Sequence, residues 1–419
     1  MVHTLRNRHF ALLFIGQTIS EMGNSFTLVA ASLLILHRTG SPAQVGLFII
    51  ATNIPALLLG LIAGTLVDRW DRRHILIASD VLRGAFIAAL PLLAEAWLGW
   101  IYVIGFANAF IARFFIPALR SILPDIVSDE ELVPANGMLA TSEHISRTIG
   151  YALAGLAVQY LSFTWAFYAD AVTFFISALS IVPISMPPLS ATQMRRQGVG
   201  AVFSDLAEGL IYMRRHGLML AIVLIGLSFT LSAGAFNGFF AAFNQRTLGG
   251  DDASYGLLEA ASSVGMALGG LLFSRSHPRN VGTMIIVGLL GVGASTVLTG
   301  LSLSPQMALP ILALGGIANT VFLLALDLII QRQVPRELRG RAFAVLGLAG
   351  RLGLTVGPAA AGLPDTLCGP GSIACDRPYV VVSGVWLVLL GLVAAALPVV
   401  RLAGYPQPGE APSREVVTK

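Results

Sequence analysis

A single carboxyl group stands near the middle of the first apolar segment. Glu21 lies about 16 Å from the start of this segment, counted at 1.5 Å per helical residue. Gln17, Ser20, Asn24 and Ser25 fall within about a turn and a half of it, so one helix face is polar. An ionised carboxyl at that depth is costly unless it is solvated, paired or protonated. The pattern favours proton or cation binding at Glu21, with a structural carboxyl as the alternative.

Other charged residues within apolar segments stand at spacings that favour pairing along one helix. Asp80 and Arg83 are three apart, and Glu143 and Arg147 are four apart, so each pair shares a helix face. We expect both pairs to be structural. His144 lies beside Glu143, and because an imidazole titrates near neutral pH, it is a further candidate for proton coupling.

The composition is that of an integral membrane protein. Of the 419 residues, 55% are hydrophobic and 11% are charged, whereas a soluble domain carries about 25% charged residues. Apolar runs of about 20 residues, enough to cross a hydrocarbon core of about 30 Å, recur along the chain. They predict an all-α membrane protein with twelve transmembrane helices, at residues 10–36, 43–66, 75–97, 99–122, 138–162, 165–187, 219–245, 254–275, 282–303, 308–331, 342–364 and 378–401.

Basic residues gather on one side of this arrangement. If the N-terminus is cytoplasmic, nineteen of the 26 Lys and Arg residues fall on the cytoplasmic side. Only Arg38, Arg246 and Arg377 fall outside, and the rest lie within spans. Cytoplasmic loops of membrane proteins carry an excess of Lys and Arg, so we expect both termini in the cytoplasm. The basic residues 1–9 precede a run long enough to span, and no cleavable signal peptide is expected.

The longest cytoplasmic loop, residues 188–218, divides the spans into two groups of six. Its segment 201–215 has the amphipathic pattern typical of a helix on a membrane surface. A shift of about 206 residues places Arg73 on Arg279, which indicates two halves related by duplication. We therefore predict an N-terminal half at residues 1–187, a C-terminal half at 219–401 and a cytoplasmic tail at 402–419.

A charged turn between the second and third spans carries a family resemblance. Residues 64–73 read G-T-L-V-D-R-W-D-R-R, and these charges are so costly in lipid that the stretch must lie in an aqueous turn. The pattern resembles the G-x-L-x-D-R-x-G-R-R loop of the major facilitator superfamily, with Asp71 where that family usually has Gly. The resemblance extends from Arg8 to Arg401. It implies a secondary transporter that works by alternating access.

The resemblance also implies a gate at this turn. In the family, the carboxylate that matches Asp68 stabilises the outward-open state by bridging to the start of the eleventh helix, where the helix dipole is positive. A plain positive anchor would explain the arginines but not Asp68. The expected gating residues are Gly64, Asp68, Arg69, Arg72, Arg73, Gly340 and Arg341.

Further patterns resemble the subgroup that holds the enterobactin exporter and the macrolide efflux pumps. They include residues 10–23 in the first span and residues 335–341 before the eleventh. The antiporter motif of the fifth helix is matched by residues 150–155, with Tyr151 in place of the usual Pro, and more fully by residues 357–362. The motif implies antiport and close helix packing at Gly150, Gly155, Gly357, Pro358 and Gly362.

Membership of this family would also decide which helices face the central cavity. Helices one and four face it, so Arg113 near mid-depth is a candidate partner for Glu21, an anion-binding residue or a structural charge. Arg351 has Asp327 as its candidate partner. Helices seven and ten also face the cavity, although we expect more than half of their Phe side chains to face lipid or other helices. The substrate candidates are Gln17, Asn24, Arg113, Arg147, Phe236, Asn237, Phe240, Asn319 and Arg351, and the proton-coupling candidates are Glu21, Asp327, Glu259 and His144.

The only two cysteines, Cys368 and Cys375, fall in an outer loop, and an oxidising exterior would allow them to form a disulfide. No His stands near them, so a metal site is not expected. The sequence contains no Walker A motif, which argues against ATP-driven transport. No hydrolytic triad stands out, so neither an enzyme nor a cofactor is expected.

These observations together predict a proton-coupled exporter of amphipathic, multidrug-like compounds. The expected partners are a small-molecule substrate, protons and the lipid bilayer, with no nucleic acid, and a monomer in the bacterial inner membrane is expected. The alternatives are an exporter of one siderophore or metabolite, for which Arg113, Arg147 and Arg351 would supply cations, and a lipid flippase. A non-transporting receptor is disfavoured because the gating motif is intact.

Overall fold

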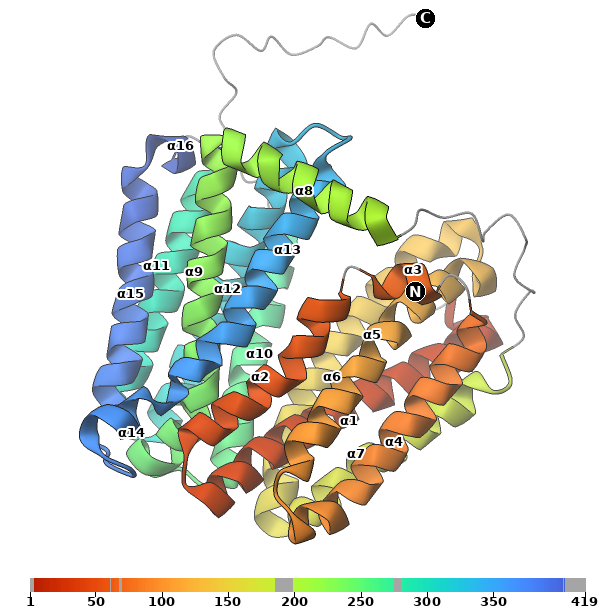
Figure 1. The fold of residues 1–419 in the computed structure, drawn as a ribbon, viewed down its shortest axis with the longest axis horizontal. Helices are drawn as coiled ribbons and strands as arrows, with labels where there is room; N and C mark the ends of the chain where they lie inside the picture. Colours follow the sequence, from red (N-terminus) through yellow and green to blue (C-terminus); the bar gives the residue numbers. More distant parts are fainter. Residues whose placement is uncertain are drawn as a thin grey trace, which may run out of the picture.

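The computed structural model describes residues 4–60, 62–67, 70–184, 199–274, 280–401 and 403, and every regular element within them is helical. The long helices form two bundles, coloured red to yellow and green to blue in Figure 1. The first bundle, the N half, consists of α1 (Arg8–Thr39), α2 (Pro42–Leu59), α4 (Arg72–Ala96), α5 (Trp100–Ile126), α6 (Leu132–Tyr160) and α7 (Phe163–Ile181). The second, the C half, consists of α9 (Gly217–Ala242), α10 (Asp252–Ser274), α11 (Val281–Leu301), α12 (Pro305–Gln333), α13 (Arg339–Val356) and α15 (Asp376–Ala396).

The predicted architecture of two six-helix halves is confirmed. Eleven segments of the described chain are long and apolar enough to cross a membrane. Helix α6 is the twelfth, with 29 residues, and Glu143, His144 and Arg147 lower its hydropathy. It packs between α1 and α10, so part of its surface meets protein rather than lipid.

Two predicted spans are not continuous helices. The span expected at 342–364 leaves α-helical geometry at Val356, continues as the 3₁₀ helix η5 (Gly357–Gly362) and ends in α14 (Leu363–Cys368). Pro358 has no backbone N–H, so regular α-helical bonding is interrupted there. The span expected at 43–66 is likewise divided between α2 and the short α3 (Ala63–Val67).

The segment between the halves contains the predicted surface helix, α8 (Val199–Arg215), which packs against α13 and α9. Its Met213 is buried, and Gly209 lies so close to Arg341 that an added Cβ would stand 2.8 Å from the Arg341 carbonyl oxygen. Residues 185–198 and 404–419 lie outside the described residues. The predicted domain boundaries at 187/188 and 401/402 therefore remain predictions.

Polar side chains and a glycine define several helix ends. The Asn7 side chain accepts from the backbone N–H groups of His9 and Phe10 at the start of α1, and Gly40 ends that helix in the left-handed conformation at φ 63°. Asp71 caps α4 by accepting from the His74 N–H. Partial burial opposes ionisation of this carboxyl, but the hydrogen bonds and the charge of His74 outweigh it and lower the pKa of Asp71 below its usual value.

The two halves lie close together at one end of the molecule and diverge at the other. In Figure 1 they approach each other at the bottom, near α14, and separate toward the top, where α8 lies. We call these the latch end, which holds Gly40, Arg246 and Asp365, and the α8 end. Two seams join the halves between them, one where α6 packs against α10 and one where α2 packs against α13 and η5.

Glycines bring the backbones into direct contact at both seams. In the α6–α10 seam, an added Cβ on Gly155 would stand 2.9 Å from the Gly256 Cα. In the α2–η5 seam, an added Cβ on Gly46 would stand 2.2 Å from the Pro358 carbonyl oxygen. Gly362 lies against Ala43 in the same seam. Gly150 and Gly357 make equally close contacts within one half, to α1 and α9 respectively.

Candidate functional site

A central cavity of about 490 Å³ lies at mid-depth against the N half. Helices α1, α2, α4, α5 and α6 all contribute to its wall. Its lining mixes charged, amide and hydroxyl side chains with a few apolar ones, as expected of a site that orients a ligand by polar contacts.

Glu21 lies in this wall on α1, with about a third of its side chain exposed. Its nearest base is Arg147 of α6, whose Nη2 stands 4.0 Å from the Glu21 Oε2. The same nitrogen is 2.8 Å from the Oε1 of Glu143, one turn away on α6. The three side chains form a cluster in which one guanidinium is shared by two carboxylates.

The Glu21–Arg113 pair considered from sequence is not formed. Arg113 lies in the cavity wall, but its Nε donates to the Ala109 carbonyl of its own helix at 3.4 Å. A base on α6 therefore takes the place expected of a base on α5, because α6 packs directly beside α1.

Arg83 is the residue that the sequence interpretation underestimated. Its Nε donates to Asn108 at 2.6 Å, its Nη2 donates to Asn24 at 2.7 Å, and its guanidinium lies 4.1 Å from the ring centroid of Phe174. The guanidinium thereby joins α1, α4, α5 and α7 at the cavity wall. Two amides at mid-depth in apolar spans, Asn24 and Asn108, are the sequence signal that could have pointed to it.

The ion pair expected between Asp80 and Arg83 is absent from the part of the chain that the structure describes. Asp80 is fully buried, and neither of its carboxylate oxygens has a hydrogen-bond partner there. Because Arg83 extends toward the cavity amides, it does not turn back one helical turn to reach Asp80. Helical spacing places the two residues on one face but does not decide where a long side chain points.

The other polar candidates of the N half differ in role. Gln17 lines the cavity and donates to Ser177 of α7 at 3.0 Å. Arg351 of α13 reaches across to the N half, where its Nη1 donates to the Ala56 carbonyl at 2.9 Å. It forms no ion pair with Asp327 within the described residues, so that expected partnership is wrong. The carbonyls near the end of α2 supply the acceptor instead.

The candidates on α9 and α12 are less consistent as cavity residues. Phe240 is 3% exposed and stacks on Phe236 at 4.8 Å between centroids, so it belongs to the hydrophobic core rather than to a substrate surface. Asn237 is exposed. Asn319 lies 3.9 Å from the Met266 sulfur, and its buried amide oxygen has no partner among the described residues.

The remaining proton-coupling candidates lie in three separate places. His144 is exposed and is not part of the cavity wall. Glu259 lies at the α6–α10 seam, facing Tyr255, with Tyr151 nearby. Asp327 lines a separate hollow within the C half. Their roles remain predictions.

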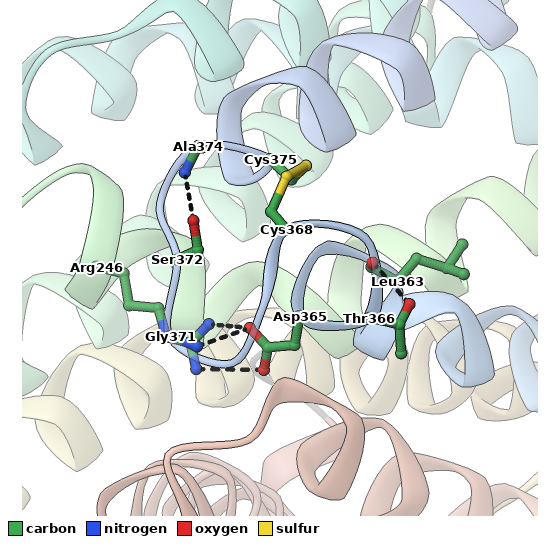
Figure 2. Close-up of a disulfide and its surroundings, with 9 residues drawn as sticks. All are labelled: Arg246, Leu363, Asp365, Thr366, Cys368, Gly371, Ser372, Ala374 and Cys375. Atoms are coloured by element: carbon green, nitrogen blue, oxygen red, sulfur yellow. Dashed lines mark hydrogen bonds and ion pairs between the residues drawn. A yellow bond between two sulfur atoms is a disulfide. The ribbon is translucent and has the colours of Figure 1, made fainter.

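The latch end is closed by Arg246, which follows α9 in the π-helical turn η4 (Phe243–Thr247). Its Nη1 lies 2.8 Å from Asp365 of α14, and its Nη2 donates to the Gly40 carbonyl of the N half. Figure 2 shows that the Asp365 carboxylate also accepts from the Gly371 N–H, at 3.3 Å, inside the ring closed by the Cys368–Cys375 disulfide. We call Arg246, Asp365 and the Gly40 carbonyl the latch.

A second set of contacts crosses between the halves beside the latch. His37 of α1 lies 3.0 Å from Asp252 of α10, and Gln245 donates to the same carboxylate at 2.8 Å. Gln159 of α6 accepts from the Asp252 N–H at 3.2 Å. The halves are therefore joined by several polar bonds at this end.

The gating residues at the α8 end bond mainly within their own half. Arg72 pairs with Asp125 at 2.9 Å, and Arg73 donates to the Val182 carbonyl. Arg341 pairs with Asp205 and Glu208 of α8, both at 2.8 Å. Gly64 lies in α3 and Gly340 in α13, each with open space where a side chain would stand, while Asp68 and Arg69 lie outside the described residues.

Most of the chain matches a known protein family. Residues 13–358 match the Major Facilitator Superfamily. The chain belongs to this family of transporters. The expected membership, and a multi-pass membrane protein that is a transporter rather than an enzyme, are thereby confirmed.

Curated relatives in this family align with nearly the whole chain at low identity. The multidrug efflux pump Tap of Mycolicibacterium fortuitum is 28% identical, over 96% of this chain and 98% of its own. The macrolide efflux protein A of Streptococcus pyogenes is 23% identical, over 83% and 87%. An MFS-type transporter of Bacillus subtilis, YfiS, is 24% identical over 91% of both chains.

Solved structures support the fold. A bacterial homologue of the human lysosomal transporter Spinster, in an inward-facing and unoccupied conformation, superposes with a TM-score of 0.73 at 16% identity. The superposition covers 96% of this chain and 98% of the homologue's chain. The nucleoside transporter NupG superposes with a TM-score of 0.71 at 14% identity, covering 93% of this chain and 98% of its own.

Proposed function

We propose that this transporter exports amphipathic compounds in exchange for protons by alternating access. Two of the aligned relatives carry efflux in their names, one for macrolides and one for multiple drugs. A polar cavity at mid-depth in the wall of the N half, in a protein whose halves meet at one end and diverge at the other, suits such a cycle. The working unit is a monomer, since one chain supplies both halves.

The α8 end faces the cytoplasm of a bacterial inner membrane in this proposal. The basic residues support it, because nineteen of 26 lie in segments assigned to that side. The disulfide at the opposite end also supports it, since disulfides persist outside the reducing cytosol. The arrangement described above is then an inward-open state with the latch closed.

One observation carries the proposed proton coupling: Glu21 stands in the cavity wall, 4.0 Å from the guanidinium that Glu143 holds at 2.8 Å. An ionised Glu21 is stabilised by Arg147, whereas a protonated Glu21 leaves that guanidinium to Glu143 alone. Proton binding at Glu21 therefore changes the charge that a substrate in the cavity meets. Substrate and proton would then compete for binding at the same cavity wall, as antiport requires.

Proton flux in proteoliposomes tests this proposal. In wild type, an imposed gradient of an exported macrolide should drive proton movement. The Glu21→Gln variant keeps the shape of the side chain but cannot exchange a proton, so we expect this movement to vanish while substrate binding persists. Glu130→Gln, an exposed acid outside the cavity, is the matched control and should behave as wild type.

A normal proton flux in the Glu21→Gln variant, with unchanged pH dependence of export, would overturn the role of Glu21. Asp327 and Glu259 would then be the next carboxyls to substitute. Loss of protein on purification would instead indicate a structural role. In that case an Arg147→Gln second substitution should cost less stability in the Glu21→Gln background than in wild type, because one of the two carboxylates that share this guanidinium is already gone.

A second candidate function is export of one anionic metabolite such as a siderophore. Arg113 and Arg351 favour it, because Arg113 lies in the cavity wall, Arg351 reaches from α13 to the N half, and neither forms an ion pair within the described residues. Replacing both with Gln should abolish export of an anionic compound but spare a neutral amphipathic one. Equal loss of both substrates would contradict this alternative.

A further inference from the structure

The C half contains a hollow of its own, separate from the central cavity. It measures about 310 Å³ and lies between α9, α12 and α13. Helix α13 is also the helix that packs against α2 of the opposite half. The hollow therefore lies on elements that change their surroundings when the halves move.

Missing side chains create this space. An added Cβ on Gly347 would meet no atom within 4 Å, and one on Gly350 would meet only the Thr230 methyl carbon at 3.9 Å. Both glycines belong to α13 and line the hollow. These positions do not bring backbones together, unlike the seam glycines, so their lack of a side chain leaves open volume.

One aromatic ring among the described residues is available to a ligand in this hollow. Phe229 of α9 and Phe322 of α12 lie 4.4 Å apart between ring centroids and are buried in the core behind it, whereas Phe343 of α13 is only partly buried. Aromatic faces carry a negative quadrupole and attract cations, quaternary ammonium groups among them. The wall therefore suits a group that is both apolar and positively charged.

One carboxylate lies among these rings. Asp327 is the only charged residue among the described residues that line the hollow, and its side chain is exposed. It stands about 9 Å before the end of α12, counted at 1.5 Å per residue. Arg351, the base expected to neutralise it, bonds to Ala56 of the other half instead. Among the described residues no base pairs with this exposed carboxylate, so its charge attracts a cation that enters the otherwise uncharged hollow.

We infer that this hollow binds the cationic nitrogen group of an amphipathic substrate, with Asp327 as its counter-ion and Phe343 against its alkyl or aryl substituents. The inference rests on the proposed function, since it names the chemical class that one part of the transporter selects. The two walls then differ in charge. In the N-half cavity three bases outnumber two acids, whereas the C-half hollow presents a single acid and no base among the described residues that line it.

Binding of a matched pair of probes to the whole protein in lipid nanodiscs tests the inference by calorimetry. The first probe is 4-phenylbutyltrimethylammonium, and the second is its neutral isostere with carbon in place of nitrogen. Wild type should bind the ammonium about tenfold more tightly than the isostere. Asp327→Asn should bring this ratio close to one, and Asp327→Glu should retain most of it.

A second variant tests the space rather than the charge. Gly350→Leu fills the hollow and should weaken both probes by about tenfold, whereas the surface control Glu130→Gln should leave both affinities unchanged. Thermal unfolding of each variant verifies that it is folded. Equal affinities for the two probes in wild type, or an unchanged ratio in a folded Asp327→Asn protein, would overturn the inference.

This experiment and the proton-flux experiment fail independently, because probe binding needs neither a gradient nor Glu21. If wild type prefers the ammonium but moves no protons with any substrate, the cation subsite holds and the proposed antiport is wrong. If proton flux depends on Glu21 but the two probes bind alike, the antiport holds and the cation subsite is wrong.

Discussion

At the latch end, Arg246 and Asp252 each bond across to the opposite half, whereas at the α8 end Arg72, Arg73 and Arg341 bond to their own half or to α8. The bonds at the latch end hold the N half and the C half together. The bonds at the α8 end supply partners for charged side chains while the two halves are apart. A transporter that alternates must break the first set of bonds and exchange partners in the second. The conformation is therefore selected at the two ends of the molecule, while the cavity lies between them.

Breaking the latch should have the largest effect on this balance. Arg246→Gln leaves the partly buried Asp365 without its base, which costs the closed latch about 2–3 kcal/mol and shifts the two conformations by about 30-fold or more. We expect the cavity to become accessible from the latch end. A Thr52→Cys reporter in the cavity wall measures this by labelling from that side, since the described structure has no free cysteine.

Arg38→Gln is the matched control, because this exposed base lies at the same end without contributing to the latch. Labelling of the reporter should match wild type in this variant. Should Arg246→Gln also label like wild type, the latch would not be what holds this end closed.

Removing the carboxylate of Asp68, which belongs to the family motif, should shift the balance between the two conformations in the opposite direction. The role of Asp68 rests on the family motif, and Asp68→Asn should remove a bridge to the start of α13 that forms when the α8 end closes. We expect about a tenfold shift toward the state described here, with slower transport and normal expression. Reporter labelling from both sides measures it. The Arg246→Gln/Asp68→Asn double variant should lie between the two single variants, and a double variant identical to either one would contradict opposed gates.

Opening the disulfide should weaken the latch without abolishing it. The ring holds the Gly371 N–H against Asp365, which in turn orients Arg246. With Cys368→Ser and Cys375→Ser together, we expect about a threefold shift toward opening at the latch end, since the ring restricts only a short loop. Electron paramagnetic resonance distances between spin labels on the two halves measure this shift. A reductant should have no further effect on the double variant, and an effect as large as that of Arg246→Gln would mean that the ring does more than position Asp365.

The smallest effect should come from the cap of α4 at the α8 end. Asp71→Ala removes the acceptor for the His74 N–H, which costs about 1 kcal/mol and lowers Tm by about 1–2 °C in a protein of this size. The pKa of Asp71 is lowered in the folded state, so its contribution is present at neutral pH and is lost as pH falls through that lowered value. Wild type and variant should therefore unfold alike in strong acid. A constant difference at every pH would contradict the cap.

The sequence predicts the bundles better than it predicts the contacts inside them. Hydropathy gives the twelve helices because lipid tolerates few charges, and even α6 was recognised despite its polar residues. Helical spacing also predicts the Glu143–Arg147 contact. It fails for Asp80 and Arg83, and the candidate pair between Arg351 and Asp327 of two different helices is also not formed within the described residues. A long guanidinium can reach several acceptors, and the choice depends on neighbouring helices. The hollow around Asp327 depends on which glycines face open space, and no spacing rule reports that.

The seam glycines carry a consequence for how such a protein can change over time. Gly155 and Gly256 in one seam, and Gly46 with Pro358 in the other, meet through backbone rather than through interlocking side chains. The glycines at which the halves meet are therefore different residues from those that line the cavity. Substitutions in the cavity lining leave both seams intact, so a descendant chain can acquire a new substrate while the packing between its halves is kept.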